Sequence, residues 1–340
     1  MKRLVAITLL LVLLTGCAAI PEPVETKQFN ATFLELFDTV TTVVGKAESE
    51  EAFQSVAWQV RDKLQVYHQL FDIYNDYDGI NNLKTVNDNA GVAPVKVDPA
   101  VIRLLQDCKE YYAATNGKVN VAMGAVLHLW HQARNDGLSD PVNAALPKEE
   151  ALREAAKHCN IDDVILDEDA STVYLRDPAM RLDVGAVAKG WAAQQVAEDS
   201  PKGLLISVGG NVCATDAKDE YGTPWVIGIE NPDGGNYLHT LNITRNNVVT
   251  SGDYQRVYVV EGKAYHHIID PVTLYPATHW RSVSVVCPDS GAADALSTAL
   301  FLLDREAGEQ LLKQYDACAM WVDSQGGKFY SPGFEELIRT

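Results

Sequence analysis

The sequence reads VILD at 164–167, TVYL at 172–175, GLLISVG at 203–209, PWVIGIE at 224–230, NVVTSG at 247–252, RVYVV at 256–260, YHHIID at 265–270 and SVSVVC at 282–287. Short apolar and β-branched runs of this kind, separated by turn residues, predict β-strands. Two stretches of helical type interrupt the series, at 186–198 and at 292–303, and the second continues to 314. Mostly antiparallel strands with helices packed on one side make an α+β fold.

The residues before this series are mainly of helical type. Asp98 followed by Pro99 has the form of a helix N-cap with Pro at the first helical position, and Asn116-Gly117 is a typical stop. We expect a helical part up to about residue 159 and a strand-rich part after it, packed as two parts or as a single domain. The helical part contains helix 48–70, loop 74–89, helix 99–114 and helix 147–158.

The N-terminus has the pattern of a secretory signal. Lys2 and Arg3 precede an apolar run over 4–14, which is about half the ~20 residues that a spanning helix needs. The Leu-Thr-Gly-Cys ending resembles a bacterial lipobox, which implies cleavage before Cys17 and acyl chains on that cysteine. We expect a signal peptide over 1–16, the lipidated cysteine and a linker over 17–30, and the main domain over 31–340. An uncleaved N-terminal anchor is the alternative.

Lipidation would hold the domain at the extracytoplasmic face of the cell membrane by its acyl chains. The net charge of −18 argues against nucleic acid as a partner, because phosphate contacts need a basic face. A nucleotide ligand needs only a local site. The five cysteines beyond Cys17 form no CxxC pair and have no zinc-ligand spacing, so we interpret them as small buried hydrophobes: Cys108, Cys159, Cys213, Cys287 and Cys318.

One candidate metal site lies in the run GAADALSTALFLL. Asp294, Ser297 and Thr298 are spaced i, i+3, i+4, so a helix places one carboxylate and two hydroxyls on one face. Hard oxygens of this kind suit Mg²⁺. Spacing alone favours a simpler role, in which the carboxylate complements the dipole of its own helix and the hydroxyls bond back to it.

Three other segments have weaker signals. In RLDVGAVAKGWAAQ we expect a strand to end near Asp183 and a helix to open near Ala186, where free amides and Lys189 would suit a phosphate. The glycines of LLISVGGNVCAT would allow the backbone to approach a ligand, or simply form a turn. His267, expected at a strand end beside Asp-Pro, would be a general base, a ligand, or a partner of a backbone carbonyl.

Taken in order, these segments resemble the ApbE family of FAD-dependent protein flavin transferases. Each motif alone is ordinary, and the order makes the signal specific over roughly residues 37–303. The motifs are FDTVTTV (37–43), the Tyr- and Asp-rich loop before LKTVN (83–87), TNGKVNVAMGAVLHLW (115–130), LDVGAVAKGWA (182–192), LISVGGNV (205–212), VVTSGDYQR (248–256), HHIIDP (266–271) and ADALSTALF (293–301).

The resemblance implies an ApbE-type fold with an FAD cleft between its two parts, and a set of site residues. Mg²⁺ would be held by the Asp294 carboxylate, the Thr298 hydroxyl and the main-chain carbonyl of Ala186. His267 matches the histidine proposed to assist catalysis, and Asp183 is the other candidate to take a proton. FAD would lie along Phe37, Tyr74, Val119, Asn120, Val121, Asp183, Lys189 and Ile269.

The chain departs from the usual family pattern at three places. Phe37-Asp38-Thr39 stands where the family often has Met-Gly-Thr, and Leu274 stands where a glycine is usual. Gly124-Ala125-Val126 replaces Gly-Pro-Leu. Ser297 stands where some relatives have a carboxylate. The first two departures affect loops around the adenine and the flavin, and none removes the predicted metal ligands.

The activity implied is Mg²⁺-dependent transfer of FMN from FAD to a Ser or Thr hydroxyl of an acceptor protein, with release of AMP. Family resemblance suggests an acceptor among membrane redox complex subunits or extracellular reductases that carry a short flavinylation motif. One alternative is an FAD pyrophosphatase, with water as the attacking group; Tyr74 and Tyr77 favour transfer, since a bulky ring over the site would exclude water. The other is a non-enzymatic lipoprotein that captures flavin.

Overall fold

The computed structural model describes residues 26–340, so the expected signal peptide and Cys17 lie outside the described residues. Its largest element is an eight-stranded sheet in which each pair of neighbouring strands is antiparallel. In spatial order the strands are β1 (Lys27–Leu36), β2 (Thr39–Ala47), β6 (Leu204–Val208), β7 (Asn211–Ala214), β10 (Asn247–Gly252), β13 (Ser282–Cys287), β14 (Cys318–Val322) and β15 (Lys328–Tyr330).

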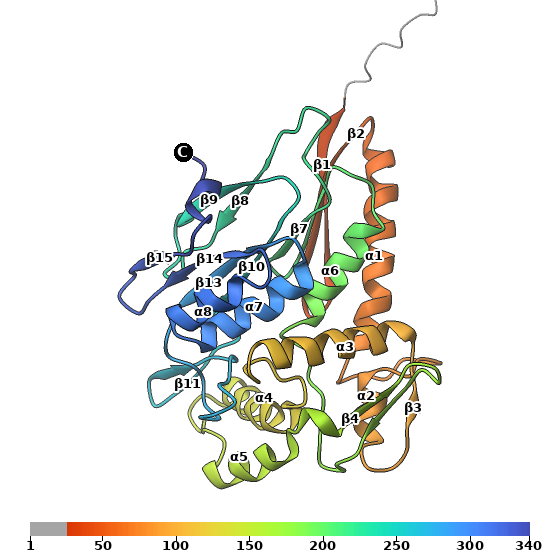
Figure 1. Cartoon of the computed structure of the whole chain (residues 1–340), viewed down its shortest axis with the longest axis vertical. Helices are drawn as coiled ribbons and strands as arrows, with labels where there is room; N and C mark the ends of the chain where they lie inside the picture. The colour runs from red at the N-terminus through yellow and green to blue at the C-terminus, as the bar shows by residue number, and fades with distance from the viewer. Residues whose placement is uncertain (1–25) are drawn as a thin grey trace, which may run out of the picture.

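Helices cover one face of this sheet. These helices are α1 (Glu50–Phe71), α6 (Ala188–Glu198), α7 (Ser290–Leu302) and α8 (Arg305–Leu312); in Figure 1, α7 and α8 lie in front of the strands and α1 lies to their right. A two-stranded sheet, β8 (Trp225–Ile229) and β9 (His239–Ile243), packs on the other face through its own apolar cluster. Because side chains alternate along a strand, Val285 faces the helices and Val286 faces β8 and β9.

The remaining elements, apart from a short helical turn near the C-terminus, form the lower half of the molecule in Figure 1. Some of their apolar side chains join those of the sheet and its helices in the main core, and the others form a separate cluster around Val126, Trp130, Leu152 and Tyr258. The elements are α2 (Leu83–Asp88), β3 (Val95–Lys96), α3 (Pro99–Ala114), α4 (Gly124–Ser139), α5 (Glu149–Ala155), η1 (Ala156–His158), η2 (Ile161–Asp163), β4 (Val164–Asp167), β5 (Thr172–Leu175), β11 (Tyr258–Val260) and β12 (Lys263–Tyr265), with η3 (Glu335–Leu337) near the C-terminus.

Local sequence signals account for most helix ends. Asp98 caps α3 by accepting from the Ala100 N–H, and Pro99 is its first residue, as expected. Asn116 and Gly117 follow α3 with positive φ values of 50° and 78°, so the expected stop is present. The prediction of an α+β fold with mostly antiparallel strands is confirmed. Among the described residues, no helix is long and apolar enough to cross a membrane.

Three local predictions were wrong. The stretch 74–89 is not all loop, because Asn82 and Thr85 form a capping box that starts α2. The helix expected to continue to 314 breaks at Leu303, which is extended, and Asp304 caps a new helix, α8. The run YHHIID is not a strand, since β12 ends at Tyr265 and the following residues form an irregular loop.

Two long strands were not expected. β1 and β2 precede the helices and pair antiparallel, from Lys27 opposite Ala47 to Leu36 opposite Thr39. β2 then pairs with β6, which lies more than 150 residues later in the chain. The large sheet therefore draws on residues from both sides of position 159.

Candidate functional site

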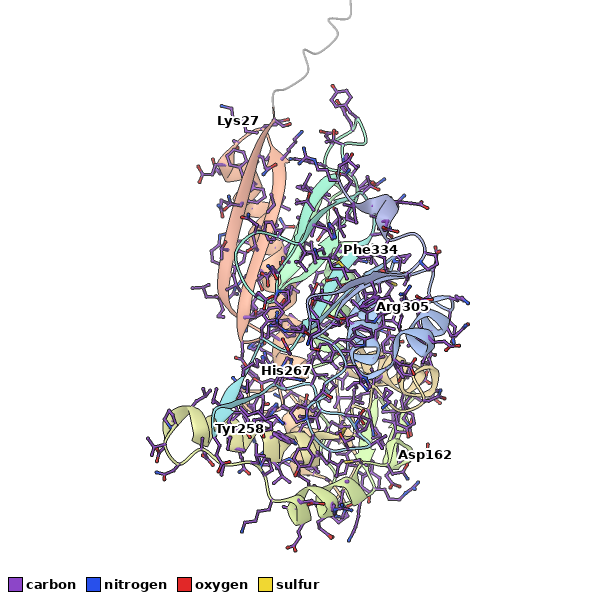
Figure 2. All side chains as sticks on the ribbon, turned by 90° about the vertical axis from the view of Figure 1, so that its left-hand side faces the viewer. Lys27, Asp162, Tyr258, His267, Arg305 and Phe334 are labelled. Carbon is purple, nitrogen blue, oxygen red and sulfur yellow. The ribbon has the colours of Figure 1, made fainter. Side chains whose placement is uncertain are left out.

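A cavity of about 500 Å³ lies where the large sheet and its helices meet the lower half of the molecule. His267, which lines this cavity, is labelled near the middle of the molecule in Figure 2. A volume of this size suits a nucleotide-sized ligand. All the residues predicted to bind FAD or the metal, or to act in catalysis, line this one cavity: Phe37, Tyr74, Val119, Asn120, Val121, Asp183, Ala186, Lys189, His267, Ile269, Asp294 and Thr298.

Asp294 of α7 caps the neighbouring helix α6. The Gly190 N–H donates to Asp294 Oδ2 at 2.9 Å, and Lys189 Nζ lies 3.6 Å from the same oxygen. α6 has no side-chain cap of its own at Val187, so this carboxylate takes that place at the positive end of the helix. Burial raises the pKa of Asp294, and the Lys189 ammonium opposes that rise. The carboxylate thus complements the dipole of α6 rather than that of its own helix.

The hydrogen bond between Gly190 and Asp294 leaves the backbone carbonyl of Ala186 without a hydrogen-bond donor in the part of the chain that the structure describes. In a regular helix the Gly190 N–H would bond to the carbonyl of Ala186. Because it bonds to Asp294 instead, no hydrogen bond reaches the Ala186 carbonyl within residues 26–340. Ala186, Asp294 and Thr298 therefore present a carbonyl, a carboxylate and a hydroxyl to the cavity, and this oxygen set fits the predicted Mg²⁺. The described residues contain no cluster of three or more His, Cys, Asp and Glu side chains suited to a metal ion.

The hydroxyls of Ser297 and Thr298 on α7 lie in different surroundings. Ser297 is fully buried, donates to the Asp294 carbonyl at 2.9 Å and shares a 2.8 Å hydrogen bond with Ser251 Oγ. It does not line the cavity, so its hydroxyl has the simpler structural role considered above. Thr298 lines the cavity, and in the described part of the chain its hydroxyl makes no hydrogen bond.

His267 is a neutral imidazole with one free nitrogen. Burial, together with a smaller effect of the positive charge of Arg256, lowers its pKa to about 3. Nδ1 lies 3.2 Å from the Gln255 carbonyl oxygen. Since a carbonyl only accepts, Nδ1 carries the proton and Nε2 keeps a lone pair.

Asp183 is placed by backbone contacts with the segment before α4. Its N–H donates to the Val121 carbonyl at 2.8 Å, and its Oδ1 accepts the Gly185 N–H at 2.9 Å. The expected strand end at Asp183 is absent, because Arg181 makes only an isolated bridge with Met123, and α6 begins two residues later than expected. This pairing brings Asp183 and the 119–121 segment to the same cavity wall.

Two tyrosines of the loop after α1 are held by histidines. Tyr74 Oη lies 2.7 Å from His131 Nδ1 on α4. His68 Nδ1 accepts the Phe37 N–H at 3.2 Å, which leaves its Nε2–H for Tyr77 Oη at 3.2 Å. Of these two tyrosines only Tyr74 lines the cavity, and 53% of the surface of Tyr74 is exposed.

Sequence reasoning missed several residues of the cavity wall. His68 and His131 had no second signal in the sequence; His68 near the end of α1 and His131 on α4 line the cavity beside the loop of Tyr74 and Tyr77, which they contact. The HHIIDP loop is fixed by an ion pair between Lys118 and Asp270 at 2.9 Å, which no local pattern indicated. The other lining residues not predicted as ligands include Asp38, Thr39, Asp72, Asn211, Thr250, Ser251, Gln255 and Arg256.

The sequence model of the ApbE family matches residues 37–321. The chain belongs to the ApbE family. A relative from Treponema pallidum, named FAD:protein FMN transferase, is 37% identical, and the match covers 72% of this chain and 71% of the relative's chain. One of the same name from Escherichia coli K12 is 25% identical over 95% and 93% of the two chains.

Solved structures of the family have the same fold. The ApbE protein of Thermotoga maritima superposes with a TM-score of 0.81 at 26% identity, and the match covers 92% of this chain and 100% of that one. The flavin transferase ApbE of Vibrio cholerae gives 0.75 at 20% identity, over 92% and 100%.

Two of the departures from the ApbE pattern have the left-handed backbone conformation that glycine favours. Asp38 and Leu274 stand where glycine is usual in the family, and both have positive φ, 51° and 65°. Phe37 also has φ of 53°. Left-handed backbone is strained for residues with a Cβ. Gly124 is retained, and a Cβ there would lie 2.5 Å from the Arg181 carbonyl oxygen.

Proposed function

We propose that this chain is an FAD:protein FMN transferase that uses Mg²⁺, attaches FMN to a Ser or Thr hydroxyl of an acceptor protein and releases AMP. Membership of the ApbE family and the names of its relatives support the transferase activity. The observation that carries the proposal is the convergence of every predicted FAD, metal and catalytic residue on one cavity, although they come from six separate segments.

The predicted Mg²⁺ ligands lie together at one wall of this cavity. Asp294, Thr298 and the Ala186 carbonyl would hold the ion, which when bound neutralises charge on the diphosphate oxygens. Lys189, 3.6 Å from Asp294, adds a positive charge beside them. This chain's own residues thus orient the diphosphate and complement its charge.

In the proposed transfer the acceptor oxygen attacks the phosphorus on the FMN side, and the bond from that phosphorus to the AMP phosphate breaks. The hydroxyl proton passes to His267 Nε2 or to the Asp183 carboxylate. A base as weak as His267 suffices, because the transition state is largely dissociative and the hydroxyl loses its proton late. The products are a phosphoester of FMN on the acceptor, and AMP.

Tyr74 supports transfer over hydrolysis. Its ring lines the cavity, and its hydroxyl is held by His131 at 2.7 Å, so the ring has a defined place at the edge of the site. A ring in that place restricts the approach of water. The proposal also includes lipidation at Cys17 and an acceptor among membrane redox subunits or extracellular reductases; the lipobox-like sequence supports the anchor.

The test uses purified protein lacking residues 1–17, FAD and Mg²⁺, with and without a peptide that carries a Ser/Thr flavinylation motif. We expect the peptide to gain the mass of an FMN adduct while AMP is released, and both to be lost in Asp294→Ala. Thr298→Val and Ser297→Ala form a matched pair, because the two hydroxyls are adjacent in sequence and only Thr298 lines the cavity. Thr298→Val should lose activity and Ser297→Ala should keep it.

Two results would replace the proposal. AMP and free FMN formed equally with and without peptide would indicate a pyrophosphatase. Tight FAD binding without AMP under any condition would indicate flavin capture.

A further inference from the structure

The residue before the predicted catalytic histidine uses both of its ring nitrogens. His266 Nε2 lies 2.8 Å from the Ala277 carbonyl oxygen, and His266 Nδ1 lies 3.2 Å from the Ile268 backbone nitrogen. A carbonyl only accepts and an N–H only donates, so Nε2 carries the proton and Nδ1 is bare. Burial lowers the pKa of His266, which is consistent with this neutral form.

The contact with Ala277 closes the base of a loop that forms part of the cavity wall, and the contact with Ile268 fixes the ring to its own arm of that loop. Inside the loop, the Ala277 N–H donates to the Ile268 carbonyl at 3.0 Å, and Ile269 bridges to Pro276. Farther out, the Asp270 N–H donates to the Tyr275 carbonyl at 2.9 Å. The His266 ring thus joins the two arms of the loop at the base of the loop.

The same ring also ties the loop to α7. It packs edge-on against Phe301, with ring centroids 5.6 Å apart and an angle of 77° between the planes. Phe301 is fully buried, and it lies one turn beyond Thr298 on the helix that carries the predicted metal ligands. His266 therefore connects three things: both arms of the loop and the helix α7.

The residues that follow His266 face the cavity. His267, Ile268 and Ile269 all line it, whereas His266 does not. The only polar contact of the His267 ring in the described residues is the 3.2 Å hydrogen bond from Nδ1 to the Gln255 carbonyl. That single bond leaves rotation about the bond axis open, so the backbone at 266–268 has to set the direction of Nε2.

We propose that His266 is a positioning residue, which fixes the orientation of the His267 ring by clamping the loop base to α7. The proposal rests on the proposed transferase function. A purely apolar core role would need only the ring contact with Phe301, and phenylalanine would serve it equally well. Phenylalanine lacks the two ring nitrogens that hydrogen-bond to Ala277 and Ile268.

The variants follow from this contrast. His266→Phe keeps an aromatic ring against Phe301 and removes both polar contacts. His266→Asn keeps a short acceptor for the Ile268 N–H, as in an Asx-turn, and loses the reach to Ala277. His279→Phe is the matched control, because His279 lies two residues after Ala277 and its side chain is exposed.

A double-mutant cycle with His267→Ala tests the proposal on kcat for peptide flavinylation. We expect His266→Phe to lower kcat roughly 10- to 100-fold, as for a displaced catalytic group, and to add almost nothing in the His267→Ala background. His266→Asn should fall between, and His279→Phe should match wild type. Losses that multiply in the double variant would overturn the proposal, as would an unchanged kcat in His266→Phe.

Histidine ¹⁵N chemical shifts give a second readout that needs no turnover. Wild type should show His267 in the single neutral form with the proton on Nδ1, and His266→Phe should show a mixture of both forms. If wild type made no flavinylated peptide, the proposed function would fail, and this spectrum alone would decide the present proposal. If His266→Phe does not fold, His266→Asn takes its place, and an unperturbed His267 in it would overturn the proposal.

Discussion

The substitution Gly190→Ala, which adds one methyl group, tests whether the site depends on the close packing of α6 against α7. A Cβ at this position would overlap the Ser290 carbonyl oxygen and lie 2.6 Å from Cβ of Asp294. Unstrained carbon–carbon contacts are about 3.5–4.0 Å, so the helices would have to separate by about 1 Å. The 2.9 Å bond from the Gly190 N–H to Asp294 would not survive that shift.

The expected loss of stability combines three terms. Overpacking costs about 1–3 kcal/mol, and losing a hydrogen bond to a charged group costs about 1.5–3 kcal/mol. The helix propensity of alanine returns about 1 kcal/mol. Gly190→Ala should therefore lower the free energy of unfolding by about 1.5–5 kcal/mol, which is a fall in Tm of roughly 2–8 °C for a domain of this size.

Thermal and urea unfolding measure this difference, and FAD binding reports on the site. Gly291→Ala on α7 is the graded control, since its nearest contacts would be 3.2 Å to Asp289 Oδ1 and 3.3 Å to Trp191 Cα. It should cost less than about 1 kcal/mol. A Gly190→Ala protein as stable as wild type, or more stable by the propensity of alanine, would refute the contact between the helices.

Three further predictions concern other parts of the cavity wall. The pKa of His267 is about 3 in the folded protein and about 6.5 unfolded, so the unfolded state binds more protons below pH 6.5 and the stability falls as the pH is lowered. Wild type should lose about 2 kcal/mol more than His267→Gln between pH 7 and pH 5, and parallel urea unfolding curves for the two would contradict this. Lys118→Met leaves the buried Asp270 carboxylate without its cation, and it should cost about 2–3 kcal/mol, while Lys96→Met at an exposed position should be neutral. Asp38→Gly relieves a φ of 51° and should raise stability by up to about 1 kcal/mol; a lower Tm would show that the aspartate is not strained there.

Features decided within a few residues could be predicted from the sequence. The cap at Asp98 and the stop at Gly117 depend on backbone and side-chain preferences of adjacent residues. The runs 204–208 and 282–287 became strands because alternating or continuous apolar residues suit a sheet covered on both faces. Local patterns failed where long-range pairing decided the outcome, as in β1 and β2, or where a cap interrupted a helix, as at Asp304.

The sequence by itself determined the α+β class, and the order of its motifs indicated the family and the twelve site residues. Helical spacing also placed Asp294 and Thr298 on one face, because residues three or four apart on a helix share a side. Only the tertiary structure decided that Asp294 caps α6 across a separation of 104 residues and so leaves the Ala186 carbonyl free. It also decided that Ser297 points away from the cavity and that His266 clamps the loop of His267. Such contacts join segments whose positions depend on sheet register and helix packing, and no local preference of the chain encodes either one.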